Sequence, residues 1–345
     1  MRLVQEGAAK LYAPEGKLTK KLSVFYNPVM WANRESMLLL FKAIGRSGSF
    51  PLPRKVGLAL AGTGVRGIRL SLEAGLSEVL MNDISPKAFE LMQKNVKLNE
   101  APGIGCSCMD ANEFIRKNRP FDYLDIDPFG SPNPFLDAAI SSLGKRGILA
   151  LTATDTAPLS GTYPAACRRK YWAEPCRDSN MHETGLRILI RKVQLIGAQY
   201  DIALLPLYSF YREHYFRIYL VSERSKKAAD AILAMHSVSG STGPLFMGNL
   251  WDTEIAEQMY HANKIPKLNS FLLTIAEESR IGSAGFFDLH QMSKKHKLEN
   301  PRKIKLIEEL KSRGHKASGT HFRPTGIRTD ASEKGFIAAI NRSLA

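Results

Sequence analysis

The sequence has few cysteines and no grouping of them that suits a metal. Four cysteines in 345 residues exclude the disulfide framework of a small secreted protein. Cys106 and Cys108 alternate along an expected strand, but no second close pair completes a tetrahedral zinc site. We therefore interpret both as small buried residues and expect no metal.

Long apolar runs are also missing. No stretch approaches the roughly 18 consecutive apolar residues that span a bilayer, and the first residues lack an apolar core of signal-peptide length. These two absences predict a cytoplasmic protein without a membrane segment. No obligate protein partner is evident.

Acidic residues are fewer than basic residues, and this imbalance indicates a polyanionic partner. There are 48 Lys and Arg against 33 Asp and Glu, a net charge of +15. The excess is concentrated, because residues 291–328 hold eleven basic and three acidic residues, a net charge of +8. Nucleic acid is the first candidate for such a segment.

Short β-rich runs alternate with helical stretches between residues 55 and 155. This alternation predicts an α/β fold, a Rossmann-like parallel sheet with helices on both faces. We expect strands at 55–60, 78–84, 103–110, 121–126 and 147–155. In the helix expected at 85–99, Ser85 suits the N-cap and Pro86 the first turn. A further helix begins near Ala111.

The sequence after residue 155 no longer alternates short strands with helices in this way. A long helix at 181–199 precedes two strands close enough to pair antiparallel, and a turn at 239–244 leads into mostly helical sequence. We expect a smaller, mostly helical α+β domain whose order suits a winged helix, although many small helical domains share that order. The predicted division is an N-terminal segment at 1–54 packed on the catalytic domain, the sheet domain at 55–225 and the C-terminal domain at 226–345.

A glycine-rich turn follows the first expected strand. Gly62, Gly64 and Gly67 have G-x-G-x-x-G spacing, which lets backbone approach a ligand at a helix N-terminus. Asp83 ends the next strand, where its carboxylate could accept hydrogen bonds from ribose hydroxyls. The pair of features fits NAD and S-adenosylmethionine equally well. Asp110 and Ala111 end the third strand, where Asp110 could border an adenine or simply cap a helix.

The fourth strand ends in a carboxylate, a proline and an aromatic. Asp127 is the first residue past this strand, whereas Asp125 lies deeper and suits a structural role. Pro128 constrains the chain, and Phe129 offers a face on which a base could stack. These residue types suit an exocyclic amine of a nucleobase, whose protons the carboxylate would accept as the nitrogen becomes nucleophilic.

The motifs together resemble those of the tRNA (guanine-26-N2)-dimethyltransferase family of archaea and eukaryotes. The matching stretches are "VFYNPVMWANRES", "ALAGTGVRGIR", "NDISPKAFELMQKNVKLN", "DIDPFGSPNPFLDAA", "GTYPAACRRKY", "MHETGLRILI" and "THFRPTGIRTDA". The resemblance implies a class I methyltransferase domain at 55–225, S-adenosylmethionine as cofactor, a C-terminal domain that helps to hold tRNA, and N2-methyl- and N2,N2-dimethylguanosine as products.

The resemblance also implies roles for individual residues, and for Arg34, Arg66 and Phe25 it is the sole basis. It implies that the cofactor is contacted by Arg34, Arg66, Asp83, Asp110 and Ala111. Asp127 would accept the guanine amine, with Phe25 and Phe129 on either side of the ring. Without the resemblance, Arg34 would be interpreted as a surface helix residue and Phe25 as a core aromatic.

The sequence departs from the family in two places. Many members carry a four-cysteine zinc site where residues 222–252 of this chain contain no cysteine, so we expect the zinc to be lost. Glu35 stands where Asp is frequent, a small change that we expect to preserve activity.

Other functions remain open at this stage. One alternative is methylation of a different exocyclic amine, such as adenine N6. A nicotinamide-dependent dehydrogenase would explain the glycine turn but neither "DPFG" nor the basic segment. A non-catalytic RNA-binding protein would explain the charge but not the cofactor-type site.

Overall fold

The computed structural model describes residues 1–15 and 24–344, which form two compact units. Unit 1 consists of Met1–Thr154, Val193–Leu205 and Arg217–Leu233, and unit 2 of Asp155–Lys192, Pro206–Phe216 and Ala234–Ala345. The division into 1–54, 55–225 and 226–345 stays a prediction, because compactness does not show which segment folds or functions by itself.

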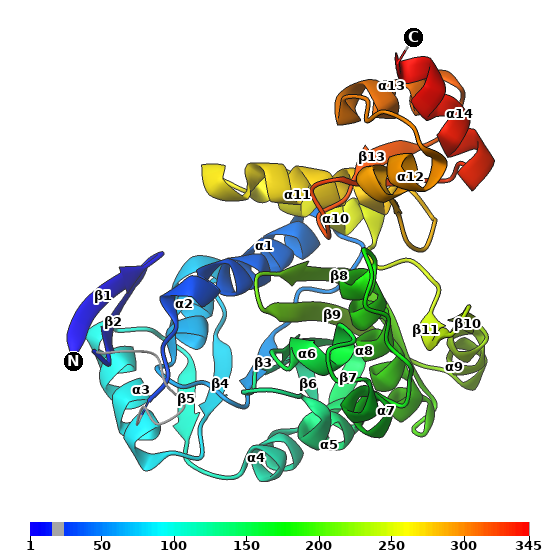
Figure 1. Ribbon diagram of the computed structural model, residues 1–345. Coiled ribbons are helices and arrows are strands. Elements are labelled where there is room, and N and C mark those ends of the chain that lie inside the picture. The colour runs from blue at the N-terminus through cyan, green and yellow to red at the C-terminus, as the bar shows by residue number, and fades with distance from the viewer. Residues whose placement is uncertain (16–23, 345) are drawn as a thin grey trace. The chain divides into compact units, whose positions relative to one another are not determined.

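A seven-stranded sheet has the strand order β5-β4-β3-β6-β7-β9-β8. The pairs from β5 to β7 are all parallel, and helices flank the sheet (Figure 1). The α/β, Rossmann-like class is thus confirmed. The strands are β3 (Lys55–Leu58), β4 (Glu78–Asn82), β5 (Ile104–Ser107), β6 (Phe121–Ile126), β7 (Leu143–Ala153), β8 (Ile202–Arg212) and β9 (Tyr215–Arg224).

The helix that follows β4 begins where the local sequence favours a helix start. Ser85 accepts a hydrogen bond from the backbone N–H of Ala88, and Pro86 is the first residue of its helix. The helices are α1 (Trp31–Ser47), α2 (Val65–Ala74), α3 (Pro86–Leu98), α4 (Ala111–Asn118), α5 (Leu136–Ser141), α8 (Met181–Ala198) and α9 (Lys226–Leu233), with short 3-10 turns η1 (Pro28–Met30) and η2 (Asn133–Phe135).

The N-terminus forms an antiparallel hairpin of β1 (Arg2–Glu6) and β2 (Ala9–Ala13). Two asparagines of the α3 region hold it: Asn95 Oδ1 accepts from the Tyr12 N–H and Asn99 Oδ1 from the Lys10 N–H, each at 2.8 Å. These bonds satisfy edge-strand groups that would otherwise be unpaired. The hairpin therefore belongs to unit 1.

Unit 2 contains most of the C-terminal helices and two small sheets. Its helices are α6 (Thr156–Leu159), α7 (Pro164–Tyr171), α10 (Thr253–Ala262), α11 (Pro266–Ser279), α12 (Leu289–His296), α13 (Lys303–Ser312) and α14 (Glu333–Leu344). The strands are β10 (His236–Ser239) and β11 (Thr242–Phe246), and β12 (Phe287–Asp288), β13 (Ala317–Gly319) and β14 (Gly326–Thr329). The likeness to a winged helix stays a prediction.

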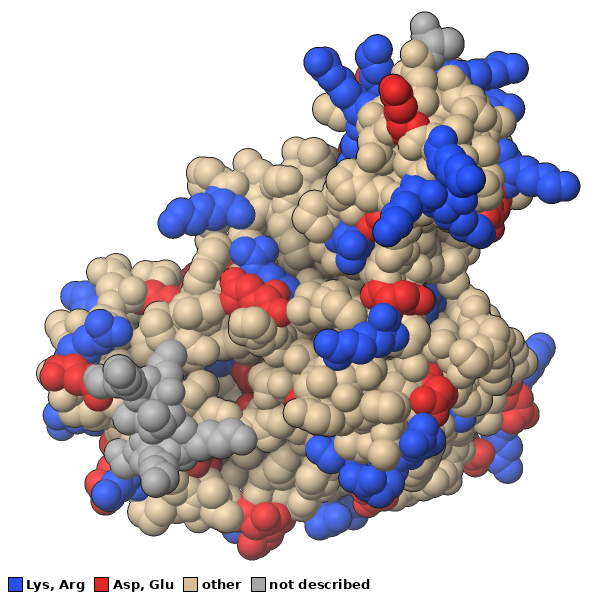
Figure 2. Space-filling view, viewed as in Figure 1, with Lys and Arg blue, Asp and Glu red and all other residues tan. Residues whose placement is uncertain are grey.

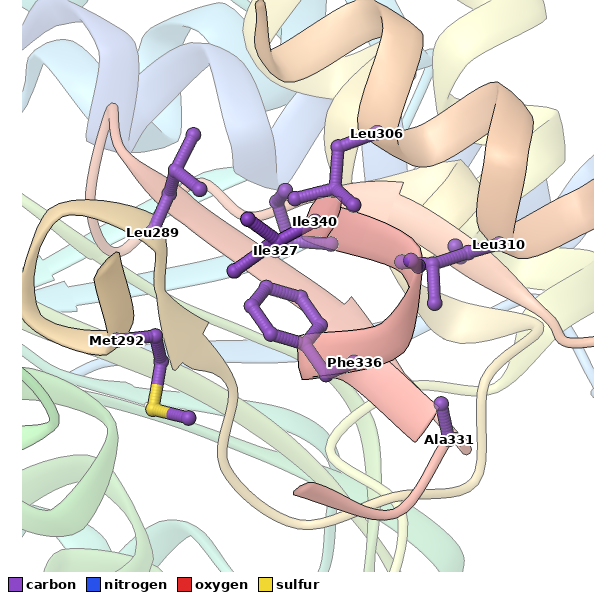
Figure 3. Close-up of a cluster of buried hydrophobic side chains, with 10 residues drawn as sticks. Leu289, Met292, Leu306, Leu310, Ile327, Ala331, Phe336 and Ile340 are labelled. Carbon is purple, nitrogen blue, oxygen red and sulfur yellow. The ribbon is translucent and has the colours of Figure 1, made fainter. Parts of the chain in front are cut away.

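The C-terminal helices share an apolar core (Figure 3). Phe336 and Ile340 of α14 pack with Leu306 and Leu310 of α13 and with Ile327 of β14. Burying large aliphatic and aromatic side chains contributes about 1.5–3 kcal/mol each. This cluster holds the small sheet and its helices together.

A buried charge network lies in the same unit. Arg328, fully buried on β14, pairs with Glu183 at 2.6 Å and with Glu278 at 3.0 Å. Burial alone would raise the pKa of Glu183, but Arg328 and Arg187 lower it to about 2. His321 Nδ1 lies 2.7 Å from Glu278 Oε1 with its side chain buried. His321 is therefore part of this buried network.

The interpretation of two cysteines as buried is wrong. Strand β5 ends at Ser107, so Cys108 is exposed, and Cys106 is only partly buried. Within residues 1–15 and 24–344, no group of three or more His, Cys, Asp or Glu side chains could hold a metal ion. No helix in that described part is both long and apolar enough to cross a bilayer.

Candidate active site

A cavity of about 520 Å³ opens in unit 1 at the carboxyl ends of parallel strands. Its walls come from the segments after β3, β4, β6 and β7, together with residues 25–34. Chain order reverses between β3 and β6, since β4 and β5 extend the sheet on one side and β7 on the other. Such switch points are where open α/β sheets bind ligands.

The glycine turn forms one wall of this cavity. Gly62 and Gly64 have φ of +56° and +80°, a region that glycine adopts without strain. A Cβ on Gly62 would lie 2.9 Å from the Phe25 carbonyl oxygen, so only glycine fits this approach. Gly64 caps α2 without a side-chain bond, which leaves helix N–H groups for a ligand. The turn therefore has the conformation that a nucleotide-type cofactor requires.

Asp83 braces this turn from the end of β4. Its Oδ2 accepts from the Gly62 N–H and its Oδ1 from the Ser85 N–H, each at 3.0 Å. A carboxylate can accept further hydrogen bonds on its remaining lone pairs. Asp83 lines the cavity and can thus support the loop and receive hydroxyl donors together.

Asp127 lines the cavity one residue past β6, and its side chain is 24% exposed. Its Oδ2 lies 2.5 Å from Nη2 of Arg66 on α2. The same Nη2 donates to Asn33 Oδ1 at 3.1 Å. Asp127, expected to accept the guanine amine, and Arg66, expected to contact the cofactor, are therefore in direct contact.

Asp125 lies below Asp127 and is buried. Arg217 donates to both of its oxygens, at 3.0 and 2.5 Å, and Tyr123 donates at 2.9 Å. Burial alone would raise the pKa of Asp125, but Arg217 and Arg66 hold it below its ordinary value. The contacts of Asp125 with buried guanidiniums agree with the structural role expected for it.

Two aromatic rings meet at the cavity. Phe25 and Phe129 are edge-to-face with centroids 4.5 Å apart, and Phe129 is 54% exposed. Pro128 lies between Asp127 and Phe129 on the wall. A base held between the rings would need them to separate and turn parallel, because the two rings now contact each other.

Arg34 lines the cavity, but its guanidinium is engaged by protein groups. It donates to both oxygens of Glu6, at 2.6 and 2.5 Å, and to the Asn27 carbonyl at 3.1 Å. Tyr26 donates to Glu6 as well, and burial with the nearby carboxylate raises the pKa of Tyr26 to about 12. This network positions the segment that carries Phe25.

Asp110 accepts from the N–H groups of Asn112 and Glu113 and caps α4. The residues that line the described cavity do not include Asp110 or Ala111. Capping, one of the two roles considered for Asp110, is present, and contact with an adenine stays a prediction.

The sequence matches the family described as "N2,N2-dimethylguanosine tRNA methyltransferase" over residues 7–239 and 233–341. The chain belongs to this family. The resemblance inferred from the motifs is thereby confirmed, and the glycine turn, Asp83 and Asp127 lie within the matched residues.

Curated members of the family match over almost their whole length. The "tRNA (guanine(26)-N(2))-dimethyltransferase" of Thermococcus kodakarensis is 38% identical, with 99% of both chains covered. The "tRNA (guanine(26)-N(2)/guanine(27)-N(2))-dimethyltransferase" of Aquifex aeolicus is also 38% identical, covering 96% of this chain and 94% of its own. A solved structure, Trm1 from Pyrococcus horikoshii with S-adenosyl-L-methionine, has a TM-score of 0.90 at 34% identity, covering 99% of this chain and 100% of that one.

Sequence reasoning missed three polar residues of this dimethyltransferase family member. Asn33, Thr152 and Arg217 are fully buried and hydrogen-bonded around Asp125 and Arg66. The sequence signal for Asn33 was its place in the quoted stretch "VFYNPVMWANRES". Thr152 and Arg217 lie inside apolar strands, and only an uncompensated Arg in "HYFRIYLV" hinted at a buried partner.

Proposed function

We propose that this protein transfers methyl groups from S-adenosylmethionine to the exocyclic N2 of guanine 26 in tRNA, giving N2-methyl- and N2,N2-dimethylguanosine. The observation that carries the proposal is Asp127-Pro128-Phe129 on the same cavity as a cofactor-type glycine turn, in a chain whose whole length matches dimethyltransferases. The dehydrogenase alternative does not explain this carboxylate and aromatic.

The polar groups around the cavity suit S-adenosylmethionine. The backbone at Gly62 and Gly64 is open to close approach, and Asp83, which accepts from the Gly62 N–H, would also accept from ribose hydroxyls. Arg34 and Arg66 are among the residues of the wall and would contact the cofactor, and Asp110 with Ala111 would border the adenine. When bound, this cofactor supplies an electrophilic methyl group on a sulfonium.

The protein's own contribution is to make a poor nucleophile reactive. The lone pair of guanine N2 is delocalised into the ring, so proton acceptance by Asp127 favours the tetrahedral nitrogen of the transition state. As the nitrogen–methyl bond forms and the sulfonium–methyl bond breaks, the departing N2 proton passes to the Asp127 carboxylate. Phe25 and Phe129 would hold the base plane, and Pro128 would constrain the loop.

Two surfaces of unit 2 support tRNA as the substrate. Figure 2 shows Lys and Arg side chains gathered over the C-terminal helices, where residues 291–328 carry a net charge of +8. On α7, Arg168, Arg169 and Lys170 are exposed and are flanked in sequence by Tyr163 and Trp172, which are exposed as well. Basic residues interleaved with aromatics suit an RNA backbone and its unstacked bases.

The setting of the enzyme follows from its substrate. We propose that it acts in the cytoplasm, on tRNA, without an obligate protein partner. Guanine 26 would have to leave the tRNA core to reach the cavity, as other enzymes that modify bases require.

The deciding experiment is methyl transfer from labelled S-adenosylmethionine to unmodified tRNA, followed by nucleoside mass analysis and mapping. We expect dimethylguanosine at position 26. A methylated adenine would replace the base assignment, and label at guanine 27 would widen it. Folded protein that binds the cofactor but labels no tRNA would refute the proposal.

Neutralising three lysines of the C-terminal unit should weaken tRNA binding. Replacing Lys294, Lys295 and Lys297 by Gln removes positive charge at the end of α12, although Lys295 is already paired with Glu333 at 2.6 Å. We expect the slope of log K against log salt to become shallower by about one for each phosphate that the protein no longer neutralises. Fluorescence binding at several salt concentrations measures it.

The matched control removes the same charge elsewhere. Lys42, Lys226 and Lys227 are exposed on α1 and α9 of unit 1, and their replacement by Gln should leave the slope unchanged. Equal slopes for the α12 variant and wild type would mean that tRNA binds another surface.

A further inference from the structure

A continuous chain of buried polar contacts ends at Asp127. Arg217 Nη1 donates to Thr152 Oγ1 at 2.9 Å, and Asn33 Nδ2 donates to the same hydroxyl oxygen at 3.1 Å. Asn33 Oδ1 accepts from Arg66 Nη2 at 3.1 Å, and that Nη2 reaches Asp127 Oδ2 at 2.5 Å. Five elements, β9, β7, α1, α2 and the end of β6, contribute one residue each.

The chain is anchored at its fully buried end, Arg217. Arg217 is fully buried and held by both oxygens of Asp125, and its guanidinium also lies over the Tyr219 ring, 4.5 Å from the centroid. Thr152 and Asn33 are fully buried as well. Buried groups of this kind have no water to replace a missing partner, so their orientations are strongly determined.

The free end of the chain is the carboxylate that the reaction needs. Among the described residues, Arg66 is the hydrogen-bond partner of the Asp127 side chain, through Oδ2. The side chain is 24% exposed and lines the cavity. Anchoring one oxygen leaves Oδ1 as the acceptor for a guanine amine.

We propose that Asn33 and Thr152 are positioning residues that act through Arg66 to orient the Asp127 carboxylate. The inference rests on the proposed function, because it assigns a task within that reaction. Neither residue is among those that line the cavity. Asn33 restrains the rotation of Arg66 by accepting a second hydrogen bond from Nη2, and Thr152 restrains the Asn33 amide by accepting from Nδ2.

Orientation of this kind affects turnover more than binding. A reacting group displaced by about 1 Å can cost on the order of 100-fold in rate, although the ligand still binds. Loss of the Thr152 hydroxyl should therefore lower kcat, whereas KM for tRNA and Kd for S-adenosylmethionine should stay near their wild-type values.

The first test compares Thr152→Val, which has the same shape without the hydroxyl, with Thr152→Ser, which keeps it. We expect kcat to fall about 10- to 100-fold in Thr152→Val and to recover in Thr152→Ser. Ser71→Ala is the matched control. It removes a hydroxyl that is also largely buried, on α2, and that donates to the Pro102 carbonyl. This variant should keep wild-type kcat. Asn33→Leu, which breaks both links, should behave like Thr152→Val.

The second test asks whether the effect passes through Asp127. In a double-mutant cycle, Thr152→Val should lower kcat in the wild-type background and add little in the Asp127→Asn background, since residues that act as one unit are not additive. Multiplicative losses would overturn the proposal. A raised cofactor Kd with unchanged kcat at saturating cofactor would also overturn it, and would assign the chain to cofactor binding.

Failure of the inference and failure of the proposed function give different results. The proposed function fails when wild-type enzyme produces no methylated guanosine. The positioning role fails when wild type is active and Thr152→Val, with its melting temperature and cofactor Kd preserved, keeps wild-type kcat.

Discussion

Replacing Asp127 by Asn is expected to lower guanine methylation by about 100-fold or more while fold and cofactor binding persist. An amide can still accept the hydrogen bond from Arg66, so the 2.5 Å interaction is replaced rather than abolished. It has no negative charge to take the proton that leaves N2. Single-turnover labelling of tRNA, with cofactor Kd measured separately, separates chemistry from binding.

The control for this variant is a carboxylate far from the chemistry. Asp230 is exposed on α9, and Asp230→Asn should methylate at the wild-type rate. If Asp127→Asn turned over as fast as this control, another group would have to receive the proton.

Replacing Arg217 by Met should destabilise the protein by about 3–5 kcal/mol, the typical cost of leaving one buried charge without its partner. Asp125 is 2% exposed and, among the described residues, would keep the Tyr123 hydroxyl and Arg66, whose Nη1 is 3.7 Å away. The midpoint of urea unfolding measures the loss of stability.

Removing both charges provides the control. In Asp125→Leu with Arg217→Met, no unpaired carboxylate remains at this position, so we expect the midpoint to recover much of the decrease. A single variant as stable as wild type would show that Arg66 and Tyr123 alone satisfy Asp125. Equal decreases in the single and double variants would show that packing of the Arg217 side chain, not charge, dominates.

The positions of the site's backbone followed from local sequence. Ser85 and Pro86 predict the start of α3, and the break after "YLDI" predicts that Asp127 lies at the sheet edge; both agree with the structure. Glycine spacing and capping are interactions between near neighbours, so a short window of sequence contains all the information that they need.

The local sequence did not predict the partners of the charged side chains. Arg66 and Arg34 carry cofactor roles by resemblance, yet the structure pairs Arg66 with Asp127 and Arg34 with Glu6. These cofactor roles remain predictions, as does the stacking of guanine between Phe25 and Phe129. Cys108 was expected inside the protein but is exposed, because its strand ends one residue earlier.

The sequence by itself thus determined the alternating α/β fold, the glycine turn, the carboxylate at the strand end and the family. Only the tertiary structure decided that Asn33, Thr152 and Arg217 connect to that carboxylate, since Asn33 and Thr152 are 119 residues apart. The physical reason is desolvation. A buried charge or amide must find a partner wherever the packed elements provide one, and that choice depends on which distant side chains the completed fold brings within hydrogen-bond distance.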